Sequence, residues 1–327
     1  MSNGVLVGVD IGGTKTAVAL SSQPPAILKR LEFPTNMEYG PEPILARIVE
    51  AIHEALSSQQ LEAADLRGIG VSCGSPLDST KGVIQQPPNL PTWKDVPIKS
   101  ILESEFGVKC FLENDANAGA LAEHRFGAAQ GTRSMIFLTM GTGIGAGLIL
   151  NGQLYRGASH LAGEIGHVRL TGFGPIGHNK AGTVEGWASG AGMARAANIA
   201  VQAAAASGEQ TLLAGLNGKN GHRLSAREIW DAAQSGDNLA MGIVSTTGER
   251  LGEALAILID LLNPECIVVG GLALRMGEAL LGPARAVVMQ EALALSASIC
   301  RIVPAALGEQ IGDVAALCTA LEGLQRG

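Results

Sequence analysis

Two glycine-rich loops, far apart in the chain, carry the residues that could do chemistry. Each joins two apolar runs: Gly12-Gly13-Thr14 in the first half of the chain and Gly141-Thr142-Gly143 in the second. Glycine lets backbone N–H groups approach a ligand without an intervening Cβ. Successive N–H groups in such a turn form a concavity that suits phosphate oxygens. The pair of loops therefore predicts two lobes that bind one polyphosphate, and hence phosphoryl transfer.

Asp10 stands two residues before the first loop. Its carboxylate could help to hold Mg²⁺, directly or through water, while the turn amides and the Thr14 hydroxyl contact phosphate. The alternative is an ordinary tight hairpin, in which Asp and Gly are common turn residues. The second loop favours the phosphate interpretation.

The second loop also satisfies the dinucleotide-binding pattern G-x-G-x-x-G/A over residues 141–146, with Glu164 at a suitable distance for the acidic partner. That fingerprint requires a helix directly after the glycines. Here residues 147–150 run straight into an Asn151-Gly152 turn, a strong hairpin signal that leaves no room for a helix. No Gly-Lys-Ser/Thr of a Walker loop follows either, so we reject the Rossmann interpretation.

Residues 113–117, Glu-Asn-Asp-Ala-Asn, lie between a predicted strand and a predicted helix. Capping of that helix explains one Asn or Asp, either Asn114 or Asp115. It does not explain two amides and two carboxylates within five positions. At the carboxyl end of a strand, where open α/β sheets hold ligands, a carboxylate can accept a proton from an attacking hydroxyl. We interpret Asp115 as this general base.

A third group lies further along the chain. Glu164, His167 and Glu185 supply acceptors and an imidazole among Gly-rich loops. Each alone is best explained as a solvent-exposed polar residue. Together they could recognise several hydroxyls of a polar ligand.

Composition excludes several classes of protein. Hydrophobic residues make up 46% and charged residues 16% of the 327 residues, which is typical of a globular chain long enough for two domains. The net charge is −7 and no Lys/Arg run is present, which argues against nucleic-acid binding. We expect no signal peptide and no membrane span. The five scattered cysteines are expected to be reduced, mostly buried thiols of a cytoplasmic protein.

Helices and strands alternate along the chain, which predicts an α/β protein with helices covering sheets. The one internal repeat that we detect is the hairpin with its glycine-rich loop, which occurs in both halves of the chain. A capping box at Ser225-Ala226-Arg227-Glu228 predicts a helix that stops near Ser235. Apolar spacing and turn signals predict two strands within residues 4–20 and further strands near 68–73, 108–112 and 266–269. They predict helices near 41–56, 98–106, 115–125 and 312–324, and a long amphipathic helix that ends at residue 263.

These motifs resemble the ROK family of sugar kinases and related repressors, over nearly the whole chain. Residues 10–16 resemble its first phosphate motif, and Pro88-Asn89-Leu90 its sugar-contacting loop. Residues 113–117 resemble its catalytic segment, and 141–167, ending in Gly163-Glu164-Ile165-Gly166-His167, its signature. The segment Val268-Val269-Gly270-Gly271 is similar to its strand and loop near the adenosine.

The resemblance implies two actin-like (ribonuclease H-like) domains that close around ATP and a hexose held in the cleft between them. Asp115 would deprotonate the sugar hydroxyl. The expected sugar-binding residues are Asn89, Asn114, Glu164, His167 and Glu185. The expected residues for Mg²⁺-ATP are Asp10, Gly12, Gly13, Thr14, Lys15, Gly141, Thr142, Gly143, Gly270 and Gly271, with Asp10 holding Mg²⁺ through the nucleotide. The expected domains are residues 1–112 with 310–327, and residues 113–309.

One departure concerns zinc. Many family members carry a Cys-x-Cys-Gly-x-x-Gly-Cys cluster after the His of Glu-x-Gly-His, and it binds structural zinc with that His. Here residues 175–185 contain no Cys, and two His alone cannot complete a tetrahedral site. We therefore expect no structural zinc, and expect backbone packing or hydrogen bonds of His178 and Asn179 to order the loop at 172–186.

The sequence thus predicts an ATP-dependent hexose kinase, a phosphotransferase with an alcohol acceptor, that makes a sugar 6-phosphate. Glucose is the first choice, and N-acetylglucosamine, N-acetylmannosamine, fructose and allose are alternatives; the donor could be ATP or polyphosphate. A homodimer is expected from family analogy. The remote alternative is a sugar-responsive repressor, which needs a helix-turn-helix segment ahead of the first Gly loop. About five residues precede the first predicted strand, which argues against it.

Overall fold

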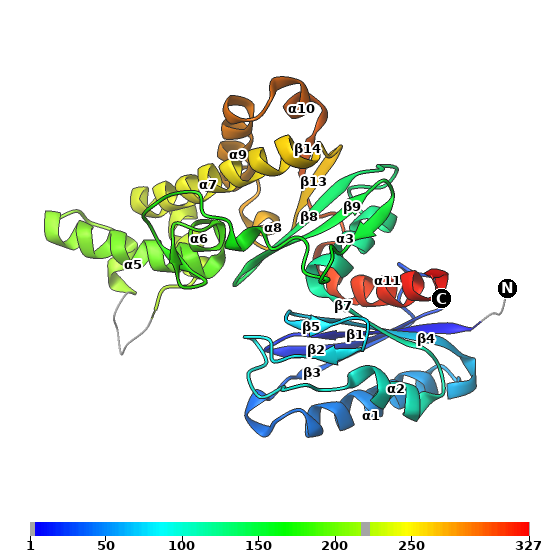
Figure 1. The fold of residues 1–327 in the computed structure, drawn as a ribbon. Helices are drawn as coiled ribbons and strands as arrows, with labels where there is room; N and C mark the ends of the chain where they lie inside the picture. The colour runs from blue at the N-terminus through cyan, green and yellow to red at the C-terminus, as the bar shows by residue number, and fades with distance from the viewer. Residues whose placement is uncertain (1–3, 217–222, 327) are drawn as a thin grey trace. The chain divides into compact units, whose positions relative to one another are not determined.

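The computed structural model describes residues 4–216 and 223–326. The chain divides into two compact units. The first comprises residues 1–130, 156–160 and 307–327, and the second comprises residues 131–155 and 161–306. Each contains one five-stranded sheet (Figure 1).

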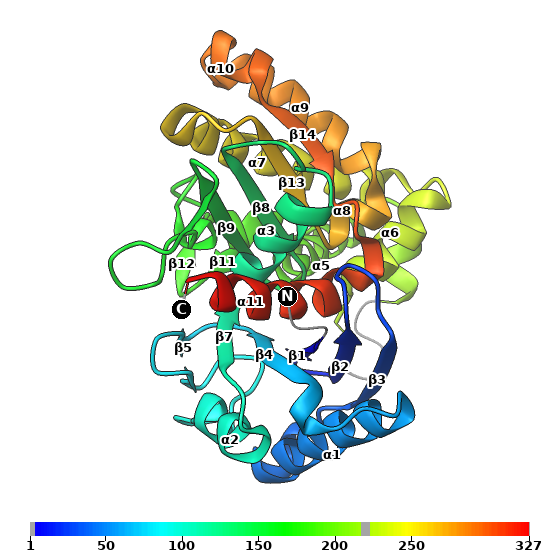
Figure 2. The same ribbon diagram turned by 90° about the vertical axis from the view of Figure 1, so that its right-hand side faces the viewer.

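The sheet of the first unit has the order β3-β2-β1-β4-β7. Figure 2 shows the strand labels in this sequence across the unit. Strands β1, β2 and β3 form an antiparallel meander, whereas β4 and β7 run parallel to β1. The strands are β1 (Val5–Ile11), β2 (Lys15–Ser21), β3 (Lys29–Pro34), β4 (Leu66–Cys73) and β7 (Cys110–Asn114), with a small β5 (Leu77–Asp78) and β6 (Val83–Ile84) pair beside them.

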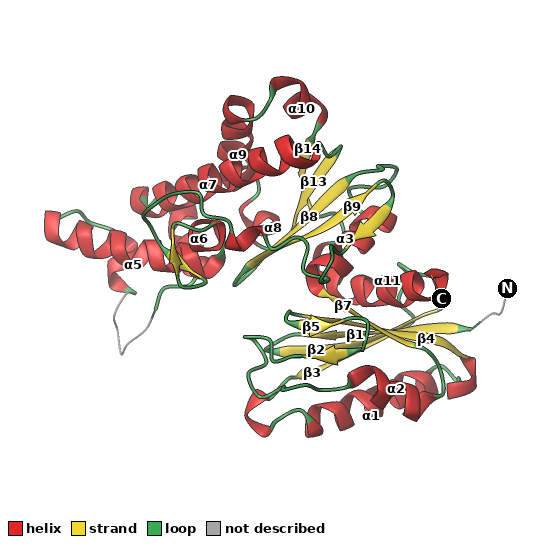
Figure 3. Ribbon diagram, in the orientation of Figure 1, coloured by secondary structure: helices red, strands yellow, loops and turns green. Residues whose placement is uncertain are grey.

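Helices cover both faces of this sheet (Figure 3). The helices α1 (Glu42–Ser58) and α2 (Ile98–Phe106) lie on one face and α11 (Ile311–Arg326) on the other, and α3 (Asp115–Phe126) packs on α11. Side chains alternate between the two faces along a strand. In β1, Val7 and Val9 therefore point into the core with α1, while Leu6 packs with Leu317 of α11.

Glycine on the other face lets α11 come close. A Cβ on Gly8 would lie 2.8 Å from the Leu317 backbone nitrogen, and one on Gly70 would meet the Ala316 carbonyl at 2.1 Å. Any larger residue at these two strand positions would push α11 away from the sheet.

The sheet of the second unit has the equivalent order β10-β9-β8-β13-β14. Again the first three strands are antiparallel and the last two are parallel to the central one. The strands are β8 (Met135–Met140), β9 (Ile144–Leu150), β10 (Gln153–Tyr155), β13 (Cys266–Val269) and β14 (Arg301–Pro304), and a separate hairpin pairs β11 (Ile176–Gly177) with β12 (Lys180–Ala181). The helices are α4 (Val184–Ala188), α5 (Gly190–Ser207), α6 (Ala226–Gln234), α7 (Asn238–Leu262), α8 (Leu272–Met276), α9 (Glu278–Glu291) and α10 (Ala294–Ile299).

Close helix packing in this unit also depends on glycine. A Cβ on Gly248 or Gly252 of α7 would approach the Leu280 or Ala284 carbonyl of α9 to 2.4 or 2.5 Å. Around this pair a continuous apolar core extends from the sheet to α5 and α6.

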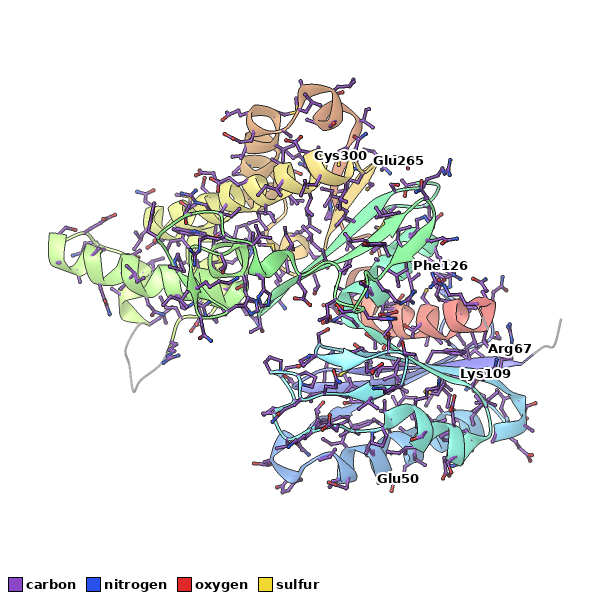
Figure 4. The ribbon with its side chains drawn as sticks, in the orientation of Figure 1. Glu50, Arg67, Lys109, Phe126, Glu265 and Cys300 are labelled. Atoms are coloured by element: carbon purple, nitrogen blue, oxygen red, sulfur yellow. The ribbon has the colours of Figure 1, made fainter. Side chains whose placement is uncertain are left out.

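Hydrogen bonds to Glu265 hold the amino ends of the parallel strands in this unit. Figure 4 labels Glu265 and Cys300, which directly precede β13 and β14. The Glu265 carboxylate accepts a hydrogen bond from the Arg133 N–H at 2.6 Å, and its carbonyl accepts one from the Arg301 N–H at 3.0 Å. The glycine-containing loops 141–143 and 270–271 follow β8 and β13 at the opposite, carboxyl ends.

Most sequence-predicted elements are confirmed to within a few residues, and the Ser225–Glu228 capping box is present. The cap of α3 is Asn114, not Asp115. The division into units differs from the expected domains, because residues 113–130 pack with the first unit, where α3 contacts α11.

Two further findings concern predictions from composition. All five cysteines are buried and free, as expected. Among the helices in the described residues, none combines the length and the apolar character needed to span a membrane.

Candidate active site

Three loops meet at one edge of the first sheet. The strand register places Ile11 beside Cys73 and Cys73 beside Asn114, so β1, β4 and β7 end together. The loop Gly12–Thr14 follows β1, Gly74–Pro76 follows β4, and Asp115 follows β7. Polar loops at the carboxyl ends of parallel strands are where α/β sheets bind ligands.

The Gly12–Thr14 turn is fixed by backbone and hydroxyl hydrogen bonds. The Gly12 N–H donates to the Lys15 carbonyl at 3.0 Å. Thr35, just after β3, donates its N–H to the Thr14 carbonyl (3.0 Å) and its hydroxyl to the Gly12 carbonyl (2.8 Å). With these carbonyls engaged, the turn presents the exposed Thr14 to solvent.

Asn89 lies against this turn. A Cβ on Gly13 would approach the Asn89 carbonyl oxygen to 2.8 Å, and one on Gly74 would lie 3.0 Å from its Oδ1. Glycine at both positions thus lets Asn89 pack closely between the loops after β1 and β4. The structure therefore brings Asn89 together with the Gly12–Thr14 turn, although they are distant in sequence.

Asp10 has a strongly perturbed acidity. Its pKa is raised to about 7, first by burial and then by the nearby charges of Asp115 and Asp313, while a hydrogen bond from Ser72 acts in the opposite direction. A buried carboxyl group beside two other acidic side chains fits the role of a partner for Mg²⁺. Lys15 points elsewhere, because its ammonium pairs with Glu32 of β3 at 2.8 Å on the surface.

Asp115 opens α3 with its carboxylate exposed to solvent. The preceding Asn114 caps the helix, with its Oδ1 accepting from the N–H groups of Ala116 and Asn117 at 3.0 and 3.3 Å. Asn114 also donates from Nδ2 to the Ser75 hydroxyl at 2.7 Å. The exposed acid is thus held on a rigid turn beside the loop after β4.

In the second unit, the loop Gly141–Gly143 joins β8 directly to β9. The following strand confirms the rejection of a dinucleotide-binding helix. The first turn of α5 holds this loop, since the Gly190 N–H donates to the Gly141 carbonyl (2.8 Å) and the Ala191 N–H to the Thr142 carbonyl (3.2 Å). Gly271 packs on the same loop with φ +60°, and a Cβ there would meet the Met140 carbonyl at 2.1 Å.

The hydrogen-bonding side chains of Glu164, His167 and Glu185 belong to segments beside this loop. Glu164 Oε2 lies 3.8 Å from His167 Nε2, and Glu185 Oε2 lies 3.2 Å from His178 Nε2. A Cβ on Gly143 would approach Glu185 Oε2 to 2.8 Å. Burial and the neighbouring His178 lower the pKa of His167, so its ring is neutral at pH 7 and can both donate and accept a hydrogen bond.

The loop at 172–186 is ordered by a hairpin and a ring stack. His178 and Asn179 take positive φ (50° and 58°) in the turn between β11 and β12. The His178 ring stacks on His167 with centroids 3.4 Å apart, and Lys180 Nζ donates to the His167 carbonyl at 2.8 Å. Throughout 4–216 and 223–326, no three His, Cys, Asp or Glu side chains converge as a metal site would require.

Each unit thus presents one glycine-rich hairpin loop and a set of polar side chains at the same sheet edge. The first unit adds an exposed carboxylate, and the second adds a neutral imidazole with two carboxylates. Phosphate binding, proton acceptance from an alcohol and recognition of hydroxyl groups are the chemistry that these groups can provide.

Comparison with known protein families identifies the chain. The model of the ROK family matches residues 6–322. The chain belongs to the ROK family. Its relatives include a glucokinase of Thermotoga maritima, 35% identical over 95% of this chain and 95% of that protein. The family resemblance stated from the motifs is confirmed.

Two solved structures confirm the predicted actin-like fold. The ROK hexokinase of Thermus thermophilus is 33% identical, with a TM-score of 0.79 over 99% of this chain and 100% of that one. A ROK family glucokinase of Streptomyces griseus in complex with glucose and AMPPNP is 31% identical, with a TM-score of 0.77 over 98% and 100% of the two chains.

Two residues that fix this site were not singled out from the sequence. Thr35 holds the first turn and Ser75 supports the helix cap. A Thr after a strand and a Ser in an exit loop carry no strong local signal. Their partners lie in distant segments, so that only the fold reveals them.

Proposed function

We propose that this protein is an ATP-dependent hexose kinase that phosphorylates the 6-hydroxyl, with glucose as its preferred substrate. It is a sugar kinase of the ROK family, like the glucokinase of Thermotoga maritima. The observation that carries the proposal is the exposed Asp115 carboxylate, held on a capped helix start at the same sheet edge as the Gly12–Thr14 turn.

In the proposed mechanism, Asp115 accepts the proton of the sugar hydroxyl as the oxygen attacks the terminal phosphoryl group of ATP. Proton transfer of this kind contributes about 10²–10⁴-fold to a rate. Asn89, Asn114, Glu164, His167 and Glu185 would hold the sugar hydroxyls and set the orientation of the acceptor oxygen.

The N–H groups and hydroxyls of the two hairpin loops would bind phosphate, and Gly270 with Gly271 would lie near the adenosine. Asp10 would hold Mg²⁺ through ATP, and the ion would supply neutralisation of phosphate charge when bound. The Streptomyces griseus relative in complex with AMPPNP supports ATP rather than polyphosphate as the donor. Lys15 has the weakest support among these residues, because its ammonium pairs with Glu32 on the surface.

The test is a coupled assay with a panel of hexoses at fixed Mg²⁺-ATP. We expect the highest kcat/KM with glucose and formation of the 6-phosphate. N-Acetylglucosamine, N-acetylmannosamine, fructose and allose form the other arms, and a higher kcat/KM with one of these would replace glucose as the substrate. Failure of every sugar to accept phosphate would overturn the proposal.

We also propose a cytoplasmic homodimer. The free, buried thiols suit a reducing compartment. Leu261 of α7, Leu293 just before α10 and Leu295 of α10 expose 75%, 66% and 71% of their surface. The Leu293 N–H donates to the Asp260 carboxylate, next to Leu261. Such a patch is typical of an interface. Light scattering should give twice the chain mass for the wild type and less for Leu295→Glu; a wild-type monomer would contradict the dimer.

A further inference from the structure

Glu113, the residue before the Asn114 cap, carries a buried carboxylate. Only 3% of its surface is exposed. Its Oε1 accepts from the Asn114 N–H at 3.1 Å and from Asn117 Nδ2 at 3.0 Å. Its Oε2 accepts from Arg156 Nε at 2.8 Å and from a terminal Arg156 nitrogen at 2.7 Å. Four donors therefore converge on one side chain.

The Oε1 half of this arrangement fixes the start of α3. Together with the Asn114 cap, it ties the first helical turn to the end of β7 from two sides. Asp115 lies between the two bonded residues, Asn114 and Asn117. Any rotation of this turn would move the Asp115 carboxylate, and displacements of about 1 Å in a reacting group are costly for catalysis.

The other carboxylate oxygen, Glu113 Oε2, binds Arg156 of a segment that is distant in sequence. Arg156 follows β10, and residues 156–160 pack with the first unit although the chain on either side belongs to the second. His160 at the end of the segment contacts the Ser79 hydroxyl at 3.1 Å through Nδ1. The next residues lead into Gly163–His167, which carries Glu164 and His167. The anchor at Arg156 thus restricts the chain that presents these two side chains.

We propose that Glu113 and Arg156 are positioning residues of the kinase reaction. The Oε1 half of Glu113 orients Asp115, and the pair with Arg156 holds the segment that leads to the sugar-binding loop. This inference rests on the proposed function. A buried ion pair stabilises a fold only weakly compared with apolar side chains of similar volume. Glu113 is better explained by its role as the acceptor for the Asn114 N–H, Asn117 Nδ2 and Arg156.

The double variant Glu113→Gln/Arg156→Met separates the two halves. The Gln amide oxygen can still accept from the Asn114 N–H and Asn117 Nδ2, while the anchor is lost and no buried charge is left unpaired. We expect the KM for the sugar to rise at least about tenfold and kcat to change less than about threefold. In Glu113→Leu/Arg156→Met the Oε1 acceptor is lost as well, and kcat should fall a further tenfold or so.

The control is Arg125→Met. Arg125, at the other end of α3, pairs with Glu322 of α11 at 2.6 Å and is similarly buried. Loss of this pair should lower the melting temperature without changing the ratio of kcat to sugar KM. If folding of the double variants fails, Arg156→Lys keeps the charge but places all its donors on one nitrogen, and it should raise the sugar KM to a lesser degree.

Amide hydrogen exchange tests the anchor without turnover. In Glu113→Gln/Arg156→Met, exchange should accelerate over residues 156–167 and stay slow at Ala116 and Asn117. Unchanged exchange and an unchanged sugar KM in a folded variant would overturn this inference alone, provided that the wild type phosphorylates a hexose in the same assay. Absence of activity in the wild type would instead overturn the proposed function.

Discussion

At the scale of single residues, neighbouring acids of the first unit differ in what surrounds them. Glu113 is buried and paired with Arg156, whereas Asp115, on the other side of the Asn114 cap, is exposed. Asp10 is half-buried, and its pKa is raised to about 7. An accessible carboxylate can accept a proton from a substrate, and a carboxyl group whose pKa is raised by burial and neighbouring acids gains from a nearby cation. Environment, rather than residue type, thus assigns the three roles that we propose.

Asp10 makes the protein less stable as the pH rises. Its folded pKa lies above the ordinary value of 3.8, so between about pH 4 and 7 the folded state binds more protons than the unfolded state, and the free energy of unfolding falls. Part of the side chain stays accessible, and we expect a loss on the order of 2–4 kcal/mol. Asp10→Asn should remove this loss, so its advantage over the wild type in urea unfolding should grow from pH 4 to pH 8.

Asp78→Asn is the matched control for that experiment. The pKa of Asp78 is lowered, first by a hydrogen bond from the Lys81 backbone, so its stabilisation is present above pH 3.8 and lost as the pH falls. The two variants should therefore change with pH in opposite directions. A constant difference between Asp10→Asn and the wild type would contradict the raised pKa.

At the scale of elements, the hairpin loops and their glycines were readable from the sequence, but their supports were not. The Asn-Gly turn after β9 and the strand after the second loop followed from local pattern. The contact of Gly271 with Met140 joins residues that local periodicity cannot relate. In the same way the anchor of Arg156 on Glu113 depends on tertiary structure.

The two kinds of loop glycine should respond differently to alanine. Gly271→Ala places a Cβ 2.1 Å from a backbone oxygen at positive φ, and we expect unfolding to become easier by more than about 2 kcal/mol. Gly141→Ala meets no described atom within 4 Å and should change stability by less than about 0.5 kcal/mol. Urea denaturation measures both, and equal effects would refute this distinction.

At the scale of the whole molecule, the two units repeat one strand order, β3-β2-β1-β4-β7 and β10-β9-β8-β13-β14. The sequence revealed only the repeated hairpin, because the insertions between the later strands differ in length and in helix content. The α/β class followed from alternating elements. The assignment of residues 113–130 to the first unit depends on the packing of α3 against α11, which local pattern cannot report.

Ligand binding should stabilise the folded molecule. A sugar at 100 times its Kd adds about 2.7 kcal/mol to the free energy of unfolding when it binds only the folded state. D-Glucose should therefore raise the melting temperature of the wild type, and L-glucose, its mirror image, should not. Equal shifts with both would indicate a general solute effect and contradict a specific sugar site.

The substitution Asp115→Asn tests the central claim most directly. The exposed carboxylate becomes an amide of the same shape, and Asn114 still caps α3. We predict that the turnover of glucose at saturating Mg²⁺-ATP falls by at least about 10²-fold while calorimetry still detects glucose binding and the melting temperature is kept. Turnover close to that of the wild type in this folded variant would show that Asp115 is not the base.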